Sequence, residues 1–240
     1  MRPLKITAWL YDNVVTTDGY LPLDSILADE YIRRRHKDIY YGPRIPGGVT
    51  GDLIVPDLPF EKRGSGDDWY WACSFNTATP TMEYISYWHK RFDDHLSKYL
   101  DLEGKSGRIN ITSGEYKNYR MPKICKVYPA LVWYAVGDKV GVEDLCRGVV
   151  AVGKKTSQGE GFVRAWEVEE NANDYSEIGS AGELNRALIE MPKGARNYRQ
   201  GFYGIRNPYW LQAHKRMVYL PLMKKARRVF EPLKGGENNA

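Results

Sequence analysis

The order of strand-like and helix-like segments constrains this chain most. Apolar residues alternate or form short continuous runs in four segments, which is typical of strands, and they recur at helical spacing in two others. In the first helical segment Ile26, Leu27, Tyr31 and Ile32 fall on one side, and Asp24 is a plausible N-cap. The order is strand, helix, strand, strand, helix, strand, over residues 5–10, 22–35, 69–75, 130–136, 142–150 and 162–168.

This order predicts an α+β fold of the ferredoxin-like (RRM-like) βαββαβ type, in which two helices cover one face of a four-stranded antiparallel sheet. A chain of 240 residues can bury one sizeable core or two small ones. We therefore expect a ferredoxin-like domain over residues 1–175 and a basic, aromatic C-terminal extension over residues 176–240. Such a sheet has a free face, and folds of this kind often present that face, or a loop at its edge, to RNA.

A long insertion is expected between the second and third strands, over about residues 77–129. Within it, residues 108–112 (RINIT) and 116–120 (YKNYR) flank Ser-Gly-Glu and predict a β-hairpin with a basic tip that includes Lys117 and Arg120. Residues 82–102 fit either a helix or a strand leading to a short helix. Residues 40–68 are punctuated by glycine and proline and predict a long loop, with a short strand at 53–55.

Positive charge is concentrated near the C-terminus. The formal net charge is only +5, but residues 193–228 hold ten basic residues, no acidic residue and six interleaved aromatic rings. Cations attract phosphates, and rings can stack on unpaired bases. A solvated basic face with its rings turned into the core is an equally weighted alternative. If the tail binds RNA, its contact residues are expected to include Arg196, Arg199, Arg206, Lys215 and Arg216.

A glycine-rich stretch, residues 152–168 (VGKKTSQGEGFVRAWEV), precedes the last predicted strand. Gly153, Gly159 and Gly161 would let backbone amides approach a partner closely. Cations at Lys154 and Lys155, with hydrogen-bonding groups at Thr156, Ser157 and Gln158, suit a nucleic-acid backbone. An ordinary turn whose lysines point to water carries similar weight on this stretch alone.

Three known sequence motifs are matched only in part by this region. Residues 148–154 satisfy G-x-x-x-x-G-K, but Lys155 replaces the Ser or Thr that would contact magnesium, and a strand follows where a helix should receive the phosphates. The pair Gly159 and Gly161 does not complete a dinucleotide-binding motif. Residues 158–163 match the RNA-recognition-motif signature only in part, because Glu160 and Ala165 stand where rings should stack.

Other function classes find little support. Cys73, Cys125 and Cys146 are far apart and odd in number, which favours buried thiols of a cytoplasmic protein over disulfides or a zinc site. No segment is long and apolar enough to span a membrane. The carboxylate pairs at 67–68 and 93–94 lack complementary ligands, so neither a metal nor a cofactor is expected.

Four stretches resemble the RAMP superfamily of CRISPR-associated RNA-binding proteins, and most closely the crRNA five-prime-handle subunit of type IV effector complexes. They are LKITAWL with PLDSILADEYIRRR, WHKRFD at 88–93, INITSGEYKNYRMP at 109–122, and the segment from 133 to 168 that contains the glycine-rich stretch. The resemblance implies a non-catalytic, prokaryotic subunit that grips the repeat-derived end of the guide RNA and caps a filament of backbone RAMP subunits. It would adjoin the large subunit where target DNA duplex enters, and the 77–129 insertion would be the family's β-hairpin thumb.

Two alternatives remain open. Some relatives in other CRISPR types cleave the guide precursor without metal, using histidine, lysine and tyrosine, and the candidates here are His89 and Lys90 beside Tyr84 and Tyr87. The alternative to catalysis is that Lys90 and Arg91 bind phosphate while His89 packs or faces solvent. A free-standing RNA-binding protein would explain the basic tail equally well.

Overall fold

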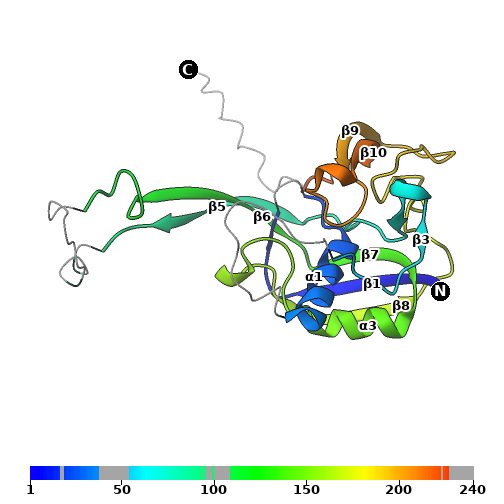
Figure 1. Ribbon diagram of the computed structural model, residues 1–240, viewed down its shortest axis with the longest axis horizontal. Helices are drawn as coiled ribbons and strands as arrows, with labels where there is room; N and C mark the ends of the chain where they lie inside the picture. Colours follow the sequence, from blue (N-terminus) through cyan, green and yellow to red (C-terminus); the bar gives the residue numbers. More distant parts are fainter. Residues whose placement is uncertain are drawn as a thin grey trace, which may run out of the picture.

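The structure is a computed structural model that describes residues 1–16, 19–37, 54–93, 95, 99, 109–222 and 224–226. It consists of a compact body and a long two-stranded arm that projects from one side of the body (Figure 1). The predicted loop at 40–68 and the short strand at 53–55 fall partly outside the described residues. Residues 54 and 55 are described and are not in a strand.

The body is built on a three-stranded antiparallel sheet in the order β7-β1-β8. Strand β1 (Arg2–Leu10) lies between β7 (Ala130–Gly137) and β8 (Val163–Glu170). Three of the four predicted strands are therefore confirmed. The central strand alternates, with Leu4, Ile6 and Ala8 buried on one face, as a period of two requires.

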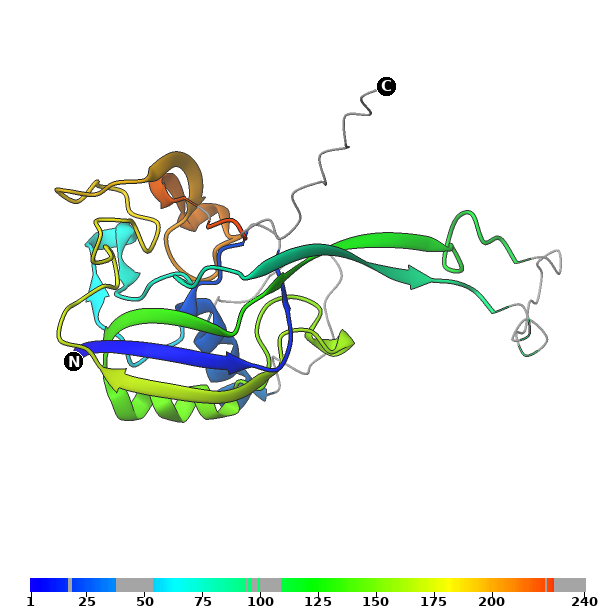
Figure 2. The same ribbon diagram turned by 180° about the vertical axis from the view of Figure 1, so that it is seen from behind.

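Both described α-helices cover the same face of this sheet, as the two opposite views show (Figures 1 and 2). Helix α1 (Leu23–Arg35) and helix α3 (Lys139–Gly148) confirm the two predicted helices. The N-cap of α3 is Asp138, whose carboxylate accepts a hydrogen bond from the Gly141 amide at 2.8 Å. The N-cap of α1 is Pro22, so the predicted cap at Asp24 is wrong.

The main core lies between the helices and the sheet. Trp133 is fully buried there, stacks on Trp166 with ring centroids 5.8 Å apart, and donates its indole N–H to the Leu21 carbonyl at 2.7 Å. Cys146 of α3 is also fully buried. All three cysteines are free and buried, which confirms the predicted thiols.

The second predicted strand is only partly regular. Strand β3 (Lys62–Arg63) pairs antiparallel with β4 (Tyr70–Trp71), and the single turn η1 (Gly66–Asp68) lies between them. Residues 72–77 then follow β7 in an antiparallel direction, through the Cys73–Ala135 bridge and hydrogen bonds at either side of it. The α+β class is confirmed, while a complete ferredoxin-like topology stays a prediction.

The arm is a hairpin of β5 (Met82–Lys90) and β6 (Tyr119–Val127), with nine residue pairs in register. The short strand β2 (Val14–Val15) pairs with the base of β6 and ties the arm to the body. The hairpin predicted from 108–112 and 116–120 is wrong: residues 109–112 form no strand, and the partner of β6 lies further back in the chain. The ambiguous segment beginning at residue 82 opens as a strand.

The C-terminal extension forms a small unit on the body, and a second, smaller core lies between the two. Strands β9 (Tyr198–Gly204) and β10 (Lys215–Pro221) pair antiparallel, and the single turn η4 (Gln212–His214) lies between them. This hairpin packs Ile205, Val218 and Leu220 against Tyr20 and Phe75 of the body. The extension is thus held to the domain by apolar contacts.

Candidate nucleic-acid interface

The glycine-rich loop links the end of α3 to β8 and folds back onto β2. Lys154 donates its backbone N–H to the Val15 carbonyl at 2.8 Å, which places the loop beside the base of the arm. One turn of 3-10 helix, η3 (Thr156–Gln158), follows Lys155, whose φ of 65° is left-handed. No helix begins here to receive phosphates, because α3 ends at Gly148 and β8 follows the loop.

The three glycines of the loop have different roles. A side chain at Gly153 would meet Val14, and one at Gly161 would lie 2.0 Å from the Val152 carbonyl oxygen. Both positions also have a positive φ, so both glycines let the loop pack against its own protein. Gly159 has a φ of 90° and no atom within 4 Å of its missing side chain. Only this glycine leaves open space for a partner.

A buried acid holds the loop to the arm. The side chain of Glu160 lies against two donors, the Asn13 side-chain amide and the Lys123 ammonium group, each 2.5 Å away. The side-chain oxygen of Asn13, Oδ1, in turn accepts from the Tyr84 hydroxyl at 3.0 Å. The side chains of Glu160 and Lys123 are about nine-tenths buried, so this network fixes the loop relative to β5 and β6.

Two free cations project from the anchored loop. Lys154 and Lys155 are exposed and form no ion pair with any described residue. The Lys155 ammonium group lies 5.6 Å from the centre of the Trp88 ring on the arm, within the range of a cation–π contact. Ser157 is also exposed, whereas Gln158 is half-buried and its carbonyl oxygen has no hydrogen-bond partner. The loop therefore presents charge and polar groups beside an aromatic ring.

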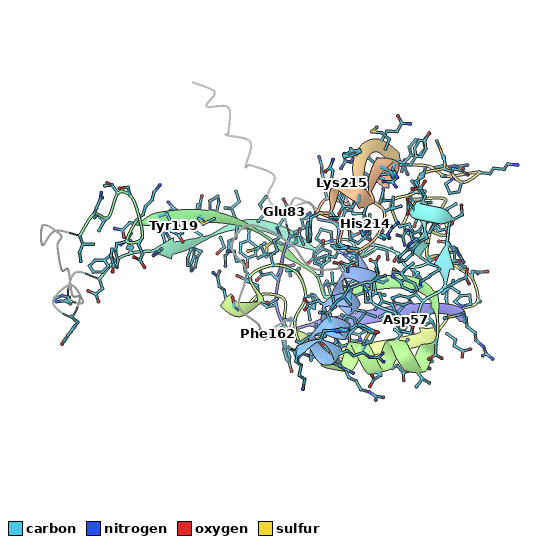
Figure 3. All side chains as sticks on the ribbon, viewed as in Figure 1. Asp57, Glu83, Tyr119, Phe162, His214 and Lys215 are labelled. Atoms are coloured by element: carbon cyan, nitrogen blue, oxygen red, sulfur yellow. The ribbon has the colours of Figure 1, made fainter. Side chains whose placement is uncertain are left out.

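The face of the arm that meets the loop continues this pattern outward. Residues that are cross-strand partners point to the same face of a hairpin. The face that carries Tyr84 therefore also carries two such pairs, Trp88 with Met121 and Lys90 with Tyr119. The Trp88 and Tyr119 rings are 5.2 Å apart, and the Lys90 ammonium group lies 5.9 Å from the Tyr119 ring. Figure 3 shows Tyr119 well out along the arm, beyond Glu83 at its base.

The opposite face of the arm carries His89 and Arg120, which are cross-strand partners. The Arg120 guanidinium group stacks on Tyr87 at 3.5 Å from the ring centre, and the rings of Tyr87 and His89 are 6.5 Å apart. Lys90 lies on the loop-facing side, because adjacent residues of a strand point to opposite faces. The structure therefore separates the predicted neighbours His89 and Lys90. Two further predicted contacts, Arg91 and Lys117, are exposed beyond the hydrogen-bonded part of the hairpin.

The open face of the main sheet is a poorer surface for RNA than the loop. Glu167 and Glu169 of β8 point to that face beside Lys5 and Trp9 of β1. Glu169 forms an ion pair with Lys5 at 3.2 Å, and Glu167 accepts a hydrogen bond from the Trp9 indole at 3.3 Å. Carboxylates repel phosphates, so the loop at the edge of the sheet is the better candidate.

A cleft of about 710 Å³ opens between the loop and α1. Its walls include hydroxyl groups of Ser25, Thr156 and Ser157, together with Lys154 and the ring of Phe162. Phe162 is 44% exposed and lies below the base of the arm (Figure 3). Asp29, Glu30 and Arg33 of α1 also line the cleft, so it carries a cation, hydroxyl groups and a ring on the loop side and two acidic residues on the α1 side.

The predicted tail residues divide into two groups. Arg206 is buried: its guanidinium group donates to the carbonyl oxygens of Asp67 and Trp69 and lies 4.7 Å from the Trp69 ring. Arg216 pairs with Asp68 at 2.8 Å. By contrast, Arg196, Arg199 and Lys215 have no acidic partner among the described residues. The tail is separated from the glycine-rich loop by the body (Figure 1).

Three important residues were not anticipated as a set. Glu160, Lys123 and Asn13 come from three separate segments, and an isolated charge in a sequence carries no sign that it will be buried. Trp88 stood within a stretch already singled out, but its role depends on its facing Lys155. A correct strand assignment for residues 82–90 would have put Trp88 and Tyr84 on one face.

Two ionisable groups near the base of the arm are partly shielded from water. Burial raises the pKa of the Tyr84 hydroxyl and also that of the Cys125 thiol beside it. Both groups are thus kept in their neutral forms. Within the described residues no three histidine, cysteine, aspartate or glutamate side chains gather in a way that could hold a metal ion.

Comparison with known proteins identifies the family. No described helix is long and apolar enough to cross a membrane. No curated protein matches the sequence at a significant level. The family model described as CRISPR type IV associated protein Csf3 matches residues 2–221, nearly the whole chain. The chain therefore belongs to the Csf3 family of CRISPR type IV associated proteins.

Proposed function

We propose that this protein is a non-catalytic subunit of a type IV CRISPR effector complex that binds the five-prime handle of the crRNA. In this proposal the handle lies between the glycine-rich loop and the inner face of the arm. The subunit caps the filament of backbone RAMP subunits and adjoins the large subunit where target DNA enters. Type IV membership comes from the family; handle binding and capping are the proposed part.

One observation carries this proposal: two unpaired lysines project from a loop that a buried acid fixes beside an aromatic arm. Lys154 and Lys155 supply charge for phosphates, and Trp88 supplies a flat surface for an unstacked base. RNA with splayed bases is recognised by this combination of charge, shape and stacking. Because the network through Glu160 orders the loop before RNA arrives, little conformational entropy is lost on binding.

The same proposal includes two statements about architecture. Residues 72–77 fill the place of the second strand of a ferredoxin-like sheet, beside β7, and the arm is the β-hairpin thumb of the RAMP fold. Residues 1–175 then form one domain and residues 176–240 an extension. The backbone hydrogen bonds that residues 72, 74 and 77 form with β7 and the length of β5 and β6 support this interpretation.

The alternative of a metal-independent ribonuclease is less favoured by the geometry. A histidine base and a lysine that stabilises the phosphorane should converge on one phosphate. His89 and Tyr87 lie on one face of the arm, whereas Lys90 and Tyr84 lie on the other. A ribonuclease would predict that His89→Ala abolishes precursor cleavage in EDTA, and the proposal predicts no effect of this variant.

The proposal is tested by replacing both loop lysines. Lys154→Ala with Lys155→Ala should weaken crRNA binding about tenfold or more and lower the slope of log affinity against log salt by about two, one for each phosphate contact. Lys37→Ala with Lys139→Ala is the control, since neither lysine belongs to the loop or the arm; Lys37 is exposed, and Lys139 is half-buried and pairs with Glu143 at 3.8 Å. Equal losses in both double variants, or no loss in the first, would remove the loop from the site.

A further inference from the structure

A second surface lies on the C-terminal unit, at the top of the body in Figure 1. The inner face of the β9–β10 hairpin packs into the small core through Tyr203, Val218 and Leu220. The register assigns the outer face to the alternate residues, in which Phe202 is opposite Met217 and Gly204 is opposite Lys215. Figure 3 shows Lys215 at this end of the molecule.

The outer face exposes rings and a thioether that nothing in the described chain covers. Phe202 is 56% exposed and Met217 is 62% exposed. Tyr198 lies on the same face and holds Tyr219 edge-on, with ring centroids 5.4 Å apart. These apolar groups form one continuous patch over two strands, and such patches on soluble proteins commonly mark a binding site.

A nearby turn extends the patch. A side chain at Gly204 would lie within 3 Å of the Tyr209 backbone, so the absence of a side chain there lets the turn rest on the outer face. Trp210 follows directly and is 62% exposed. The Tyr209 side chain turns inward and donates to both carboxylate oxygens of Asp24, at 2.8 and 2.9 Å. The turn is thereby fixed, and it adds a third large ring to the surface.

The segment that forms the patch carries charge of one sign, and the nearby acids Asp68 and Glu183, beside Arg216 and Arg196, come from other segments. Residues 191–222 contain no acidic side chain. Arg206 and Arg216 are used within the protein, but Lys193, Arg196, Arg199 and Lys215 have no acidic partner among the described residues. Protein-binding patches are typically depleted in lysine, whereas rings bordered by cations suit a strand of unpaired bases.

We infer that the outer face of β9 and β10 binds single-stranded nucleic acid, with bases stacked on Phe202, Tyr198 and Trp210 and phosphates attracted by Lys215. Recognition would be largely independent of sequence, because every base has a flat face and the described side chains here offer few groups that read base edges. This surface is additional to the loop that is proposed to bind the guide handle. A flanking part of the guide or a displaced DNA strand both have the required chemistry.

The test measures fluorescence anisotropy with labelled 15-nucleotide oligo(U) and oligo(dT), using full-length protein that carries Lys154→Ala and Lys155→Ala. This background removes the glycine-rich loop as a binding surface, so failure of the handle proposal does not decide the outcome. Phe202→Ala should weaken binding about fivefold or more, Phe202→Trp should retain it, and Lys215→Ala should lower the salt slope by about one. Tyr11→Ala, which removes a ring that is 72% exposed on the body, is the matched control.

Two results would overturn the inference. One is that the Phe202→Ala protein, with the circular dichroism spectrum of a native fold, binds both oligonucleotides as tightly as the protein that keeps Phe202. The other is full binding by Phe202→Leu, because an apolar side chain without a ring would then suffice and the face would be a protein-docking surface. A preference for oligo(U) would support the inference and assign the surface to RNA. A preference for oligo(dT) would support it and assign the surface to DNA.

Discussion

The glycine-rich loop and the C-terminal unit are both rich in positive charge, but they use it differently. In the loop, the backbone is fixed by a buried acid, Glu160, and the two lysines are left to solvent. In the C-terminal unit, arginines themselves provide the fixing: Arg186 is fully buried and Arg206 nearly so. Each donates to backbone carbonyl oxygens of the segment from Asp67 to Cys73.

This difference shows that a run of basic residues in the sequence does not by itself predict a basic surface. A guanidinium group has five donors in a fixed plane, so it can satisfy several carbonyl groups of an irregular strand at once. Residues 72–77 have only part of a regular β-ladder and depend on such donors. Only the cations that remain on the surface are available to a binding partner.

The largest effect is expected from removing Arg186. Its guanidinium group donates to the carbonyl oxygens of Trp71, Cys73 and Ile205 and lies 4.5 Å from the Tyr70 ring. Arg186→Met should lower the free energy of unfolding by about 3–5 kcal/mol, because these carbonyl acceptors lose their donor and the buried Asp24 loses a nearby positive charge. Urea denaturation measures this change.

Arg199→Met is the control for this measurement, since Arg199 is exposed and unpaired, and it should change stability by less than about 0.5 kcal/mol. Similar small effects for both variants would show that the buried guanidinium group does not hold the C-terminal unit to the body.

A smaller effect is expected at Glu160. Glu160→Ala should lower the free energy of unfolding by about 1–3 kcal/mol, because Lys123 and Asn13 are left buried without their acceptor. Amide hydrogen exchange should increase in the loop and at the base of β6, while the main sheet stays protected. Glu167→Ala is the matched control on the open face of the sheet. Faster exchange throughout the body would contradict a local anchor.

The smallest effect concerns the cysteines. Burial raises the pKa of the Cys146 thiol to about 12 and that of Cys73 still further above its ordinary value. Thiolate is the reactive form, and a raised pKa removes it at neutral and mildly alkaline pH. Iodoacetamide at pH 8 should therefore leave both residues unmodified in native protein and alkylate both in guanidinium chloride. Rapid alkylation of native protein would show that the core opens.

Much of the body could be predicted from the sequence. The alternation in residues 5–10 and 130–136 and the helical spacing in 22–35 act locally, and they identified β1, β7 and α1 because tertiary contacts reinforce the same pattern. The arm was predicted less well. In residues 82–90 (MEYISYWHK) nearly every side chain is at least partly exposed, so no buried face produces a clear period.

The site was predicted in composition but not in arrangement. The lysines, glycines and hydroxyl groups of residues 153–161 could be identified because they are adjacent in the chain. Their contacts with Trp88 and Lys123 depend on the register of β5 and β6, which no local pattern determines. The inward turn of Arg206 likewise follows from the path of residues 67–69, a segment more than a hundred residues away.

Photo-crosslinking of crRNA to the purified type IV complex, followed by mass spectrometry of the linked peptides, tests the central claim most directly. Handle nucleotides should link to peptides that contain Lys155 and Trp88, and the link should be lost in the Lys154→Ala and Lys155→Ala variant. Handle nucleotides that link only to other subunits, with the loop peptide unmodified, would contradict the account.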